Sequence, residues 1–288
     1  MNTVAADSMP GKWGRYGGGA NSLGALWPYL VVGAISGAIS GVFGLGGGVV
    51  IVPLLVFLFH FNQRQASATS ALALAPIALS GVTSFAYHGS VHWIGGITLA
   101  AGIFFGARLG VKLQQKLSLL ALEIVFLVFI AVSAVMLWVF IPDRSSHFEL
   151  HWWVLVLLAV SGFTAGIATG LLGIGGGVIV VPLLIVGFGM SDILAKGTSL
   201  LMAFVGAIAA TQKQFKSGNV QFGPAIAIGV SAAATAPFGA WIAVSIDPFT
   251  ANVLFSVFLA LIAVQYCLRI RKDVKAKKLA DRGESVEA

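Results

Sequence analysis

Charged residues and cysteine are scarce in this chain. Asp, Glu, Lys and Arg make up 9% of the 288 residues and hydrophobic residues 58%, and the one cysteine, Cys267, lies in an apolar run. A single cysteine excludes an internal disulfide. So few charges exclude a soluble domain, in which roughly a quarter of all residues are charged. The mean hydropathy of +0.96 and apolar runs of about twenty residues predict an all-α polytopic membrane protein, because barrel strands would alternate with period two.

Carboxylates are missing from the middle of every predicted span. Glu123 and Asp192 each lie near the end of an apolar segment. A dehydrated cation site inside a membrane normally uses such carboxylates or a dense set of backbone carbonyls. The spans therefore favour an anion over a cation as ligand.

Signatures of enzymes and of metal sites are missing as well. The chain has no Gly-Lys-Ser/Thr after a glycine loop and no His-Glu-x-x-His, so neither ATP hydrolysis nor zinc-dependent hydrolysis is expected. The pairs His88/His92 and His147/His151 have a spacing that could hold a metal, but no Cys, Asp or Glu stands in register to complete a site. We predict no enzyme, no metal and no cofactor, and any active transport must use an ion gradient.

Basic residues give the chain a net charge of +7. They stand at the ends of hydrophobic runs and in the tail from Arg269 to Lys278, where they are typical of topology signals and of contacts with anionic lipid. Membrane lipids, and not nucleic acid, are therefore the predicted partners.

One stretch occurs twice, 129 residues apart. Gly44-Leu45-Gly46-Gly47-Gly48 and Gly173-Ile174-Gly175-Gly176-Gly177 are each followed by four residues and Pro-Leu-Leu, and twelve of the 23 positions from 33 to 55 are identical in the second copy. Each glycine frees the backbone and costs a helix about 1 kcal/mol relative to alanine, so we expect a break at each triplet. Matching breaks in two repeats are the best sequence indication of a transporter's binding site.

Glycines four residues apart precede both triplets. We interpret these two ladders as faces for close helix packing: Gly33, Gly37 and Gly41, and Gly162, Gly166 and Gly170. The same packing role is the alternative for the triplets, although packing needs a glycine at every fourth residue and not three in succession.

Ten apolar segments form two matching sets: 24–43, 49–61, 66–87, 93–111 and 119–141, then 152–172, 178–190, 193–212, 221–245 and 250–269. The two short segments, 49–61 and 178–190, would be about 20 Å long as helices and cannot cross a hydrocarbon core of about 30 Å. Each repeat is therefore predicted to hold a glycine-broken segment, made of half-helices or a re-entrant arm, plus three spanning helices.

These segments predict five parts of the chain: a disordered cytoplasmic leader 1–24, a membrane repeat 25–141, an external linker 142–151, a second membrane repeat 152–270 and a basic cytoplasmic tail 271–288. The leader is not expected to be a signal peptide, because no cleavage site follows a short apolar core.

The positions of Lys and Arg predict the orientation. Parallel repeats of four spans would place Arg64 and the cluster Arg108, Lys112 and Lys116 on the side opposite the basic tail, which violates the positive-inside rule. If each broken segment returns to its own side, the second repeat is inverted and these residues all face the cytoplasm. We predict two inverted repeats in the inner membrane, with both termini cytoplasmic.

Each triplet precedes a predicted helix start, from Val49 and from Val178 onward. A helix start offers unpaired N–H groups and the positive end of the dipole, roughly half a unit charge, and two such starts facing one cavity form an anion site. The pairs Thr69/Ser70 and Thr198/Ser199, again 129 residues apart, could donate to the anion's oxygens. The alternative is that these hydroxyls bond back to the carbonyl four residues earlier in their own helix.

Two basic residues are candidates for binding the substrate's charge, Arg108 and Lys196. Both lie near span ends, where snorkelling toward the interface is the favoured interpretation. Lys196 aligns with Ser67 of the first repeat, so the two half-sites should differ in charge.

The doubled glycine motif with its Thr-Ser pairs, in a chain of two similar halves, resembles the sulfite exporter TauE/SafE family of bacterial permeases. The resemblance covers about residues 25 to 272 and implies an inner-membrane transporter for sulfite, sulfoacetate or related sulfur-containing anions. Carried over to matching positions, it implies these substrate-binding residues: Gly46, Gly47, Gly48, Val49, Thr69, Ser70, Gly175, Gly176, Gly177, Val178, Thr198 and Ser199.

We therefore predict a secondary transporter, expected to be an exporter, that moves sulfite, an organosulfonate or a related small anion by rocking of two repeats about a midplane site. A coupling ion would be a further partner, and no oligomeric state is assigned. The alternatives are an uncoupled anion channel and a non-transporting membrane scaffold.

Overall fold

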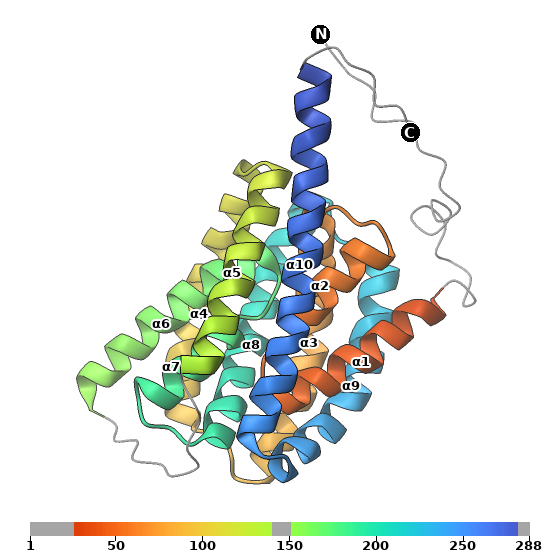
Figure 1. The fold of residues 1–288 in the computed structure, drawn as a ribbon. Helices are drawn as coiled ribbons and strands as arrows, with labels where there is room; N and C mark the ends of the chain where they lie inside the picture. Colours follow the sequence, from red (N-terminus) through yellow and green to blue (C-terminus); the bar gives the residue numbers. More distant parts are fainter. Residues whose placement is uncertain (1–25, 140–150, 282–288) are drawn as a thin grey trace.

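The computed structural model describes residues 26–139 and 151–281, and within these ranges it contains helices and no strands. The helices of the first half are α1 (Trp27–Phe43), α2 (Gly48–Leu58), α3 (Gln63–Tyr87), α4 (Trp93–Lys116) and α5 (Leu119–Val139) (Figure 1). Those of the second half are α6 (Trp152–Leu172), α7 (Gly177–Val186), α8 (Asp192–Gln214), the 3-10 turn η3 (Phe215–Ser217), α9 (Phe222–Ser245) and α10 (Pro248–Asp281). The prediction of an all-α fold is confirmed, while the leader, nearly all of the linker and the end of the tail lie outside the described residues.

The two halves contain the same helices in the same order. The starts of α2 and α7, of α3 and α8, of α4 and α9 and of α5 and α10 are each 129 residues apart. The helices α2 and α7 have 11 and 10 residues, which is about 16 Å and too short to cross a bilayer core. Within the described ranges, five helices are long and apolar enough to span a membrane: α3, α4, α6, α8 and α9.

The halves are interleaved and not side by side. The first helix of each half packs along the fourth helix of the other, α1 on α9 and α6 on α4, while α3 and α8 pack together and α5 packs on α10. In Figure 1, α10 extends well beyond the other helices at its C-terminal end. Because contacts between the halves include all of these pairs, the two repeats form one core.

The glycine ladders lie where these interleaved helices cross. A Cβ atom placed on Gly41 of α1 would be 2.6 Å from the backbone nitrogen of Ala240 in α9, and one on Gly166 of α6 would be 2.7 Å from the carbonyl oxygen of Ile103 in α4. Such separations leave no room for a side chain. The prediction that the ladders are close-packing faces is confirmed.

Equivalent helices of the two halves run antiparallel where they meet. Phe85, near the end of α3, lies against Gly197, near the start of α8. Along α5 and α10, Glu123 pairs with Arg269 while Phe126 stacks on Tyr266 with ring centroids 4.8 Å apart, so the chain advances in opposite directions. Antiparallel contact of equivalent helices is the geometry expected of inverted repeats, and the inversion itself stays a prediction.

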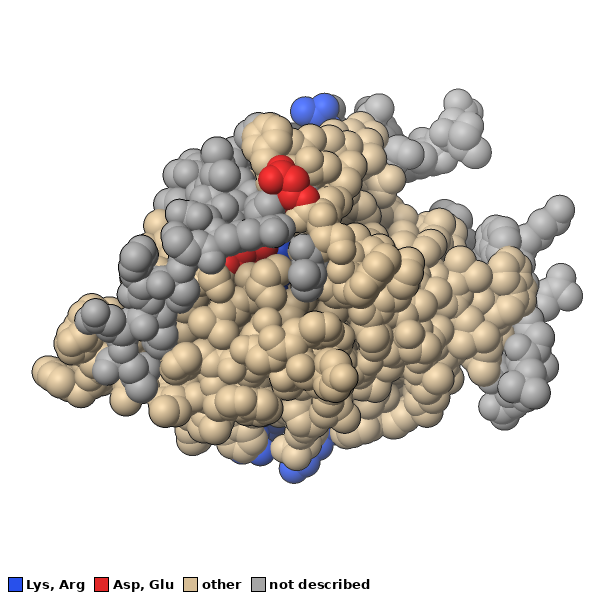
Figure 2. All heavy atoms as spheres, turned by 90° about the horizontal axis from the view of Figure 1, so that it is seen from below, with Lys and Arg blue, Asp and Glu red and all other residues tan. Residues whose placement is uncertain are grey.

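Large apolar side chains cover much of the outer surface. Examples are Trp27 (64% exposed), Val230 (62%) and Trp241 (61%). Figure 2 shows a face on which charged atoms form only a few small patches. A surface of this kind suits lipid and not water, and with several membrane-spanning helices it describes a multi-pass membrane protein.

Candidate substrate site

The predicted helix breaks are present in both halves. The helix α1 ends at Phe43, Gly44 takes a left-handed conformation with φ of 67°, and α2 starts at Gly48 behind the N-cap Gly47 with φ of 81°. In the second half the corresponding left-handed residues are Gly173, Gly175 and Gly176, and α7 starts at Gly177. Side chains disfavour these positive φ values, which explains the glycines. Both helices start one residue earlier than the predicted Val49 and Val178.

The two breaks touch each other inside the protein. A Cβ atom placed on Gly46 would lie 3.9 Å from the Cα atom of Gly175, and one on Gly48 would lie 2.6 Å from the Cα atom of Ile174. Gly177 lies against the first break in the same way. Residues 44–50 and 172–178 are all buried, so the starts of α2 and α7 face a common, water-excluded centre.

The first N–H groups of both short helices make no hydrogen bond within the described residues. Among the hydrogen bonds of the described residues, none uses the N–H groups of Gly48 and Val49 or those of Gly177 and Val178. The first N–H groups that donate to a helix carbonyl are those of Val50 and Ile51 in α2, which bond to Gly47. In α7 they are those of Ile179 and Val180, which bond to Gly176. Two helix dipoles therefore point their positive ends at the same place.

The predicted serines hold the breaks of the opposite half. Ser70 Oγ donates to the carbonyl oxygen of Gly173 at 2.8 Å, and Ser199 Oγ donates to that of Gly44 at 2.6 Å. A hydroxyl has one proton to donate, so in this conformation each serine can only accept from a further group. Their contact with a substrate stays a prediction.

The predicted threonines join α3 and α8 to the start of the fourth helix of the opposite half. Thr198 Oγ1 accepts from the N–H of His92 at 3.0 Å, and Thr69 Oγ1 accepts from the N–H of Gln221 at 3.2 Å. Thr198 also donates to the carbonyl of Leu194, four residues earlier, at 2.6 Å. The back-bonding alternative therefore holds for Thr198.

Lys196 does not snorkel, and that interpretation was wrong. The residue is 6% exposed, and its Nζ atom lies 2.9 Å from Oδ2 of Asp192, which is 2% exposed. Its Cγ atom would be 2.8 Å from a Cβ atom placed on Gly44, so the side chain covers the first break. The asymmetry with Ser67 is real, but the ammonium charge is already neutralised by the neighbouring carboxylate. The signal in the sequence was the i, i+4 spacing of Asp and Lys.

Arg108 lies away from the breaks. Its Nη2 atom donates to Oε1 of Gln212 at 3.0 Å, and its guanidinium lies 3.9 Å from the ring centre of Phe104. Among the described residues, no three of His, Cys, Asp and Glu are placed to hold a metal ion. His92 instead caps the start of α4, where its Nδ1 atom accepts from the N–H of Gly95.

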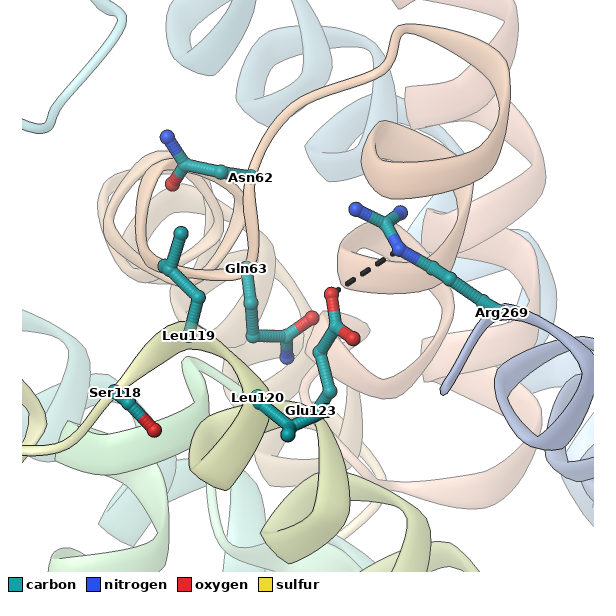
Figure 3. A pocket seen from close by; sticks show the side chains of 7 residues that line it. All are labelled: Asn62, Gln63, Ser118, Leu119, Leu120, Glu123 and Arg269. Carbon is teal, nitrogen blue, oxygen red and sulfur yellow. Dashed lines mark ion pairs between the residues drawn. The ribbon is translucent and has the colours of Figure 1, made fainter. Parts of the chain in front are cut away.

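A cavity of about 330 Å³ lies where α3, α5 and α10 meet (Figure 3). Figure 3 shows the side chains of Glu123 and Arg269, which line it, pointing toward each other, with Oε1 of Glu123 3.1 Å from Nε of Arg269. The amide of Gln63, on the wall of the cavity, accepts from the hydroxyl of Tyr266 at 2.8 Å. The paired charges cancel, so these contacts fasten α10 to the starts of α3 and α5.

Two serines of α1 that no sequence motif singled out, Ser36 and Ser40, lie next to the first break. A Cβ atom placed on Gly47 would lie 3.4 Å from the Cβ atom of Ser40 and 3.5 Å from the carbonyl oxygen of Ser36. Their position four and eight residues before Gly44 on one helix face was the available signal.

Comparison with known proteins gives one family for both halves. The profile of the family described as "Sulfite exporter TauE/SafE" matches residues 5–137 and 157–286. "Probable membrane transporter protein YunE" of Bacillus subtilis (strain 168) is 25% identical over 260 residues, which are 82% of this chain and 95% of that protein. A "Probable membrane transporter protein" of Xylella fastidiosa (strain 9a5c) is 31% identical over 175 residues, 59% of this chain and 66% of that protein.

No solved structure matches this chain significantly. The names of the two relatives describe transporters and name no substrate. Because the family profile covers the helices of both halves, including both glycine breaks, this chain belongs to the sulfite exporter TauE/SafE family.

Proposed function

We propose that this protein is a secondary transporter that exports sulfite, an organosulfonate or a related small sulfur-containing anion across the inner membrane. The observation that carries the proposal is the buried contact of the two glycine breaks, which brings the starts of α2 and α7 together. Backbone N–H groups and dipole ends favour an anion there. The family description names sulfite.

The way in which the site binds also suits a carrier. Lys196, the nearest cation identified at the breaks, is paired with Asp192, so the anion would be held by dipoles and hydrogen bonds alone. Dipolar attraction is worth about 0.3–2 kcal/mol per helix terminus, which allows release. A site without an unpaired charged side chain would bind the anion weakly enough to release it, as transport requires.

Inverted repeats would supply the conformational change. The antiparallel contacts of α3 with α8 and of α5 with α10 support a twofold axis in the membrane plane, and rocking of one half against the other about such an axis exposes a central site to each side in turn. The close packing of the two breaks then represents a conformation closed at its centre.

Ligand binding to the purified protein tests the proposal. We expect sulfite or sulfoacetate to raise the unfolding temperature, because a ligand that binds only the folded state stabilises it, and taurine, sulfate and chloride to define selectivity. Proteoliposomes should show counterflow of labelled sulfite. Conductance without counterflow would indicate a channel, and no response to any of these anions would contradict an anion site.

A double substitution at the N-caps, Gly47→Val with Gly176→Val, tests the location. The side chains would occupy the space beside both helix starts, so we expect inserted protein without flux, at reduced stability because both glycines have positive φ. The equivalent leucines of the two short helices, Leu54 and Leu183, give the matched control Leu54→Val with Leu183→Val, which should transport normally. Wild-type flux in the glycine variant would contradict the site.

A further inference from the structure

Two hydroxyls of α1 are buried without any partner. Ser36 and Ser40 are 0% and 1% exposed, and among the described residues neither Oγ atom has a hydrogen-bond partner. A buried hydroxyl that makes no hydrogen bond destabilises the folded state. Alanine would avoid this cost in a packed helix, so the two serines require an explanation.

Both serines adjoin the start of α2. They lie one turn apart on α1. A Cβ atom placed on Gly47, the N-cap of α2, would be 3.4 Å from the Cβ atom of Ser40 and 3.5 Å from the backbone carbonyl oxygen of Ser36. The next two residues, Gly48 and Val49, are those whose N–H groups are unused. The side chain of Ser40 and the backbone of Ser36 thus adjoin the start of α2, where two backbone amides are unused, and both hydroxyls can rotate and donate.

The second half does not repeat this arrangement. Ala165 stands where the first half has Ser36, and Thr169 where it has Ser40. Thr169 Oγ1 donates to the carbonyl oxygen of Ala165 at 2.8 Å, and it would be 2.9 Å from a Cβ atom placed on Gly176. At the start of α7, therefore, the only hydroxyl in the equivalent place has already used its proton.

We propose that Ser36 and Ser40, together with the N–H groups at the start of α2, form the subsite for the substrate's oxyanion head group, an XO₃-type group such as sulfite or a sulfonate. The inference rests on the proposed function and adds an asymmetry to it. The first half binds the oxygens of the head group. The start of α7 contacts the remainder of the substrate through backbone N–H groups alone. A head group with several acceptor oxygens matches several converging donors, whereas a halide gains less from them.

The double variant Ser36→Ala with Ser40→Ala tests this inference by two measurements of opposite sign. Removing unpartnered hydroxyls should leave the unfolding temperature without ligand unchanged or raise it. The dissociation constant for sulfite and for sulfoacetate should rise about tenfold or more, since a hydrogen bond to a charged group contributes about 1.5–3 kcal/mol. Chloride binding, measured in parallel, should change much less.

Thr169→Ala is the matched control, because it removes the hydroxyl at the position equivalent to Ser40. Since that hydroxyl is already bonded to Ala165, affinity for sulfite should change less than about threefold, or less than about 0.7 kcal/mol. Equal losses in the control and in the serine variant would overturn the asymmetry.

The outcomes separate the two proposals. If the wild-type protein binds no sulfur anion, the proposed function and the subsite both fail. If the wild type binds sulfite and the double serine variant binds it equally well, the subsite alone fails. A lower unfolding temperature of the variant without ligand would show a structural role for the hydroxyls and would also overturn the subsite. Should the double variant not fold, the single variants Ser36→Ala and Ser40→Ala are measured in the same way.

Discussion

At the residue scale, the two halves differ in the polar residues that they bury in the first turns of α3 and α8. Asp192 and Lys196 form a buried ion pair in α8, whereas the equivalent residues of α3, Gln63 and Ser67, are joined by a hydrogen bond from Ser67 Oγ to the carbonyl of Gln63 at 2.8 Å. A buried ion pair is costly to break and much less costly to replace as a whole. The neutral residues Gln63 and Ser67 of the first half therefore suggest which uncharged residues could replace the ion pair of the second half.

Replacing one partner of this pair should destabilise the protein strongly. Lys196→Met leaves the Asp192 carboxylate buried and unpaired, and we expect the free energy of unfolding to fall by about 3–5 kcal/mol. The double variant Asp192→Gln with Lys196→Ser, which copies the first half, should recover most of that loss. Thermal unfolding in detergent measures both, and equal stability of the single and double variants would contradict the argument.

His92 should make the stability depend on pH. Partial burial lowers the pKa of His92 below its usual value of 6.5, because the charged ring loses water. The unfolded chain then binds more protons than the folded one as pH falls through 6.5, so stability is full above that pH and declines below it. Protonation of Nδ1 would also remove the acceptor for the N–H of Gly95.

The variant His92→Asn provides the comparison for that pH dependence. Asparagine is a good N-cap and does not titrate, so it keeps the start of α4 capped. We expect the unfolding temperature of the wild type to fall more steeply between about pH 7 and about pH 5 than that of the variant. Parallel curves would show that His92 does not contribute.

At the element scale, sequence patterns were sufficient for the helices and insufficient for their polar contacts. Length and hydropathy predicted all ten segments, and the glycine triplets predicted both breaks to within one residue. The bond from Ser70 to Gly173 joins residues 103 positions apart, and no periodicity within one helix can reveal such a partner. The spacing of Asp192 and Lys196 was visible in the sequence, but the contact of Lys196 with Gly44 in the first break was not.

The glycine ladders should be intolerant of side chains that the lipid-facing side of the same helix accepts. Gly37 of α1 lies on the backbone of Ala232 in α9, and Gly166 of α6 lies on α4. Gly37→Leu or Gly166→Leu would force these helices apart, and we expect loss of folded, monodisperse protein after extraction. Ile35 lies on another face of α1 and is 49% exposed, so the control Ile35→Leu should behave as the wild type. Normal yields of the two glycine variants would contradict the close packing.

At the scale of the whole molecule, interleaving explains how two similar halves form one body. Each half alone would leave its glycine face and its break exposed, because α1 and α6 pack on helices of the other half. The same interleaving brings the two breaks together, and the antiparallel pair α3 and α8 holds them through Ser70 and Ser199. If the two halves are inverted repeats, as we propose, equivalent residues face opposite sides of the membrane.

Labelling of two equivalent surface residues tests that consequence. Tyr87 ends α3 and is 89% exposed, and Lys216, 129 residues later, is exposed after α8. Cys267, which is exposed, is first replaced by serine, and Tyr87→Cys and Lys216→Cys are made separately in that background. With an impermeant maleimide on intact spheroplasts, we expect Tyr87→Cys to react and Lys216→Cys to react only after the membrane is opened, because basic residues face the cytoplasm. Reaction of both from one side would require parallel repeats and would remove the twofold axis on which the rocking mechanism depends.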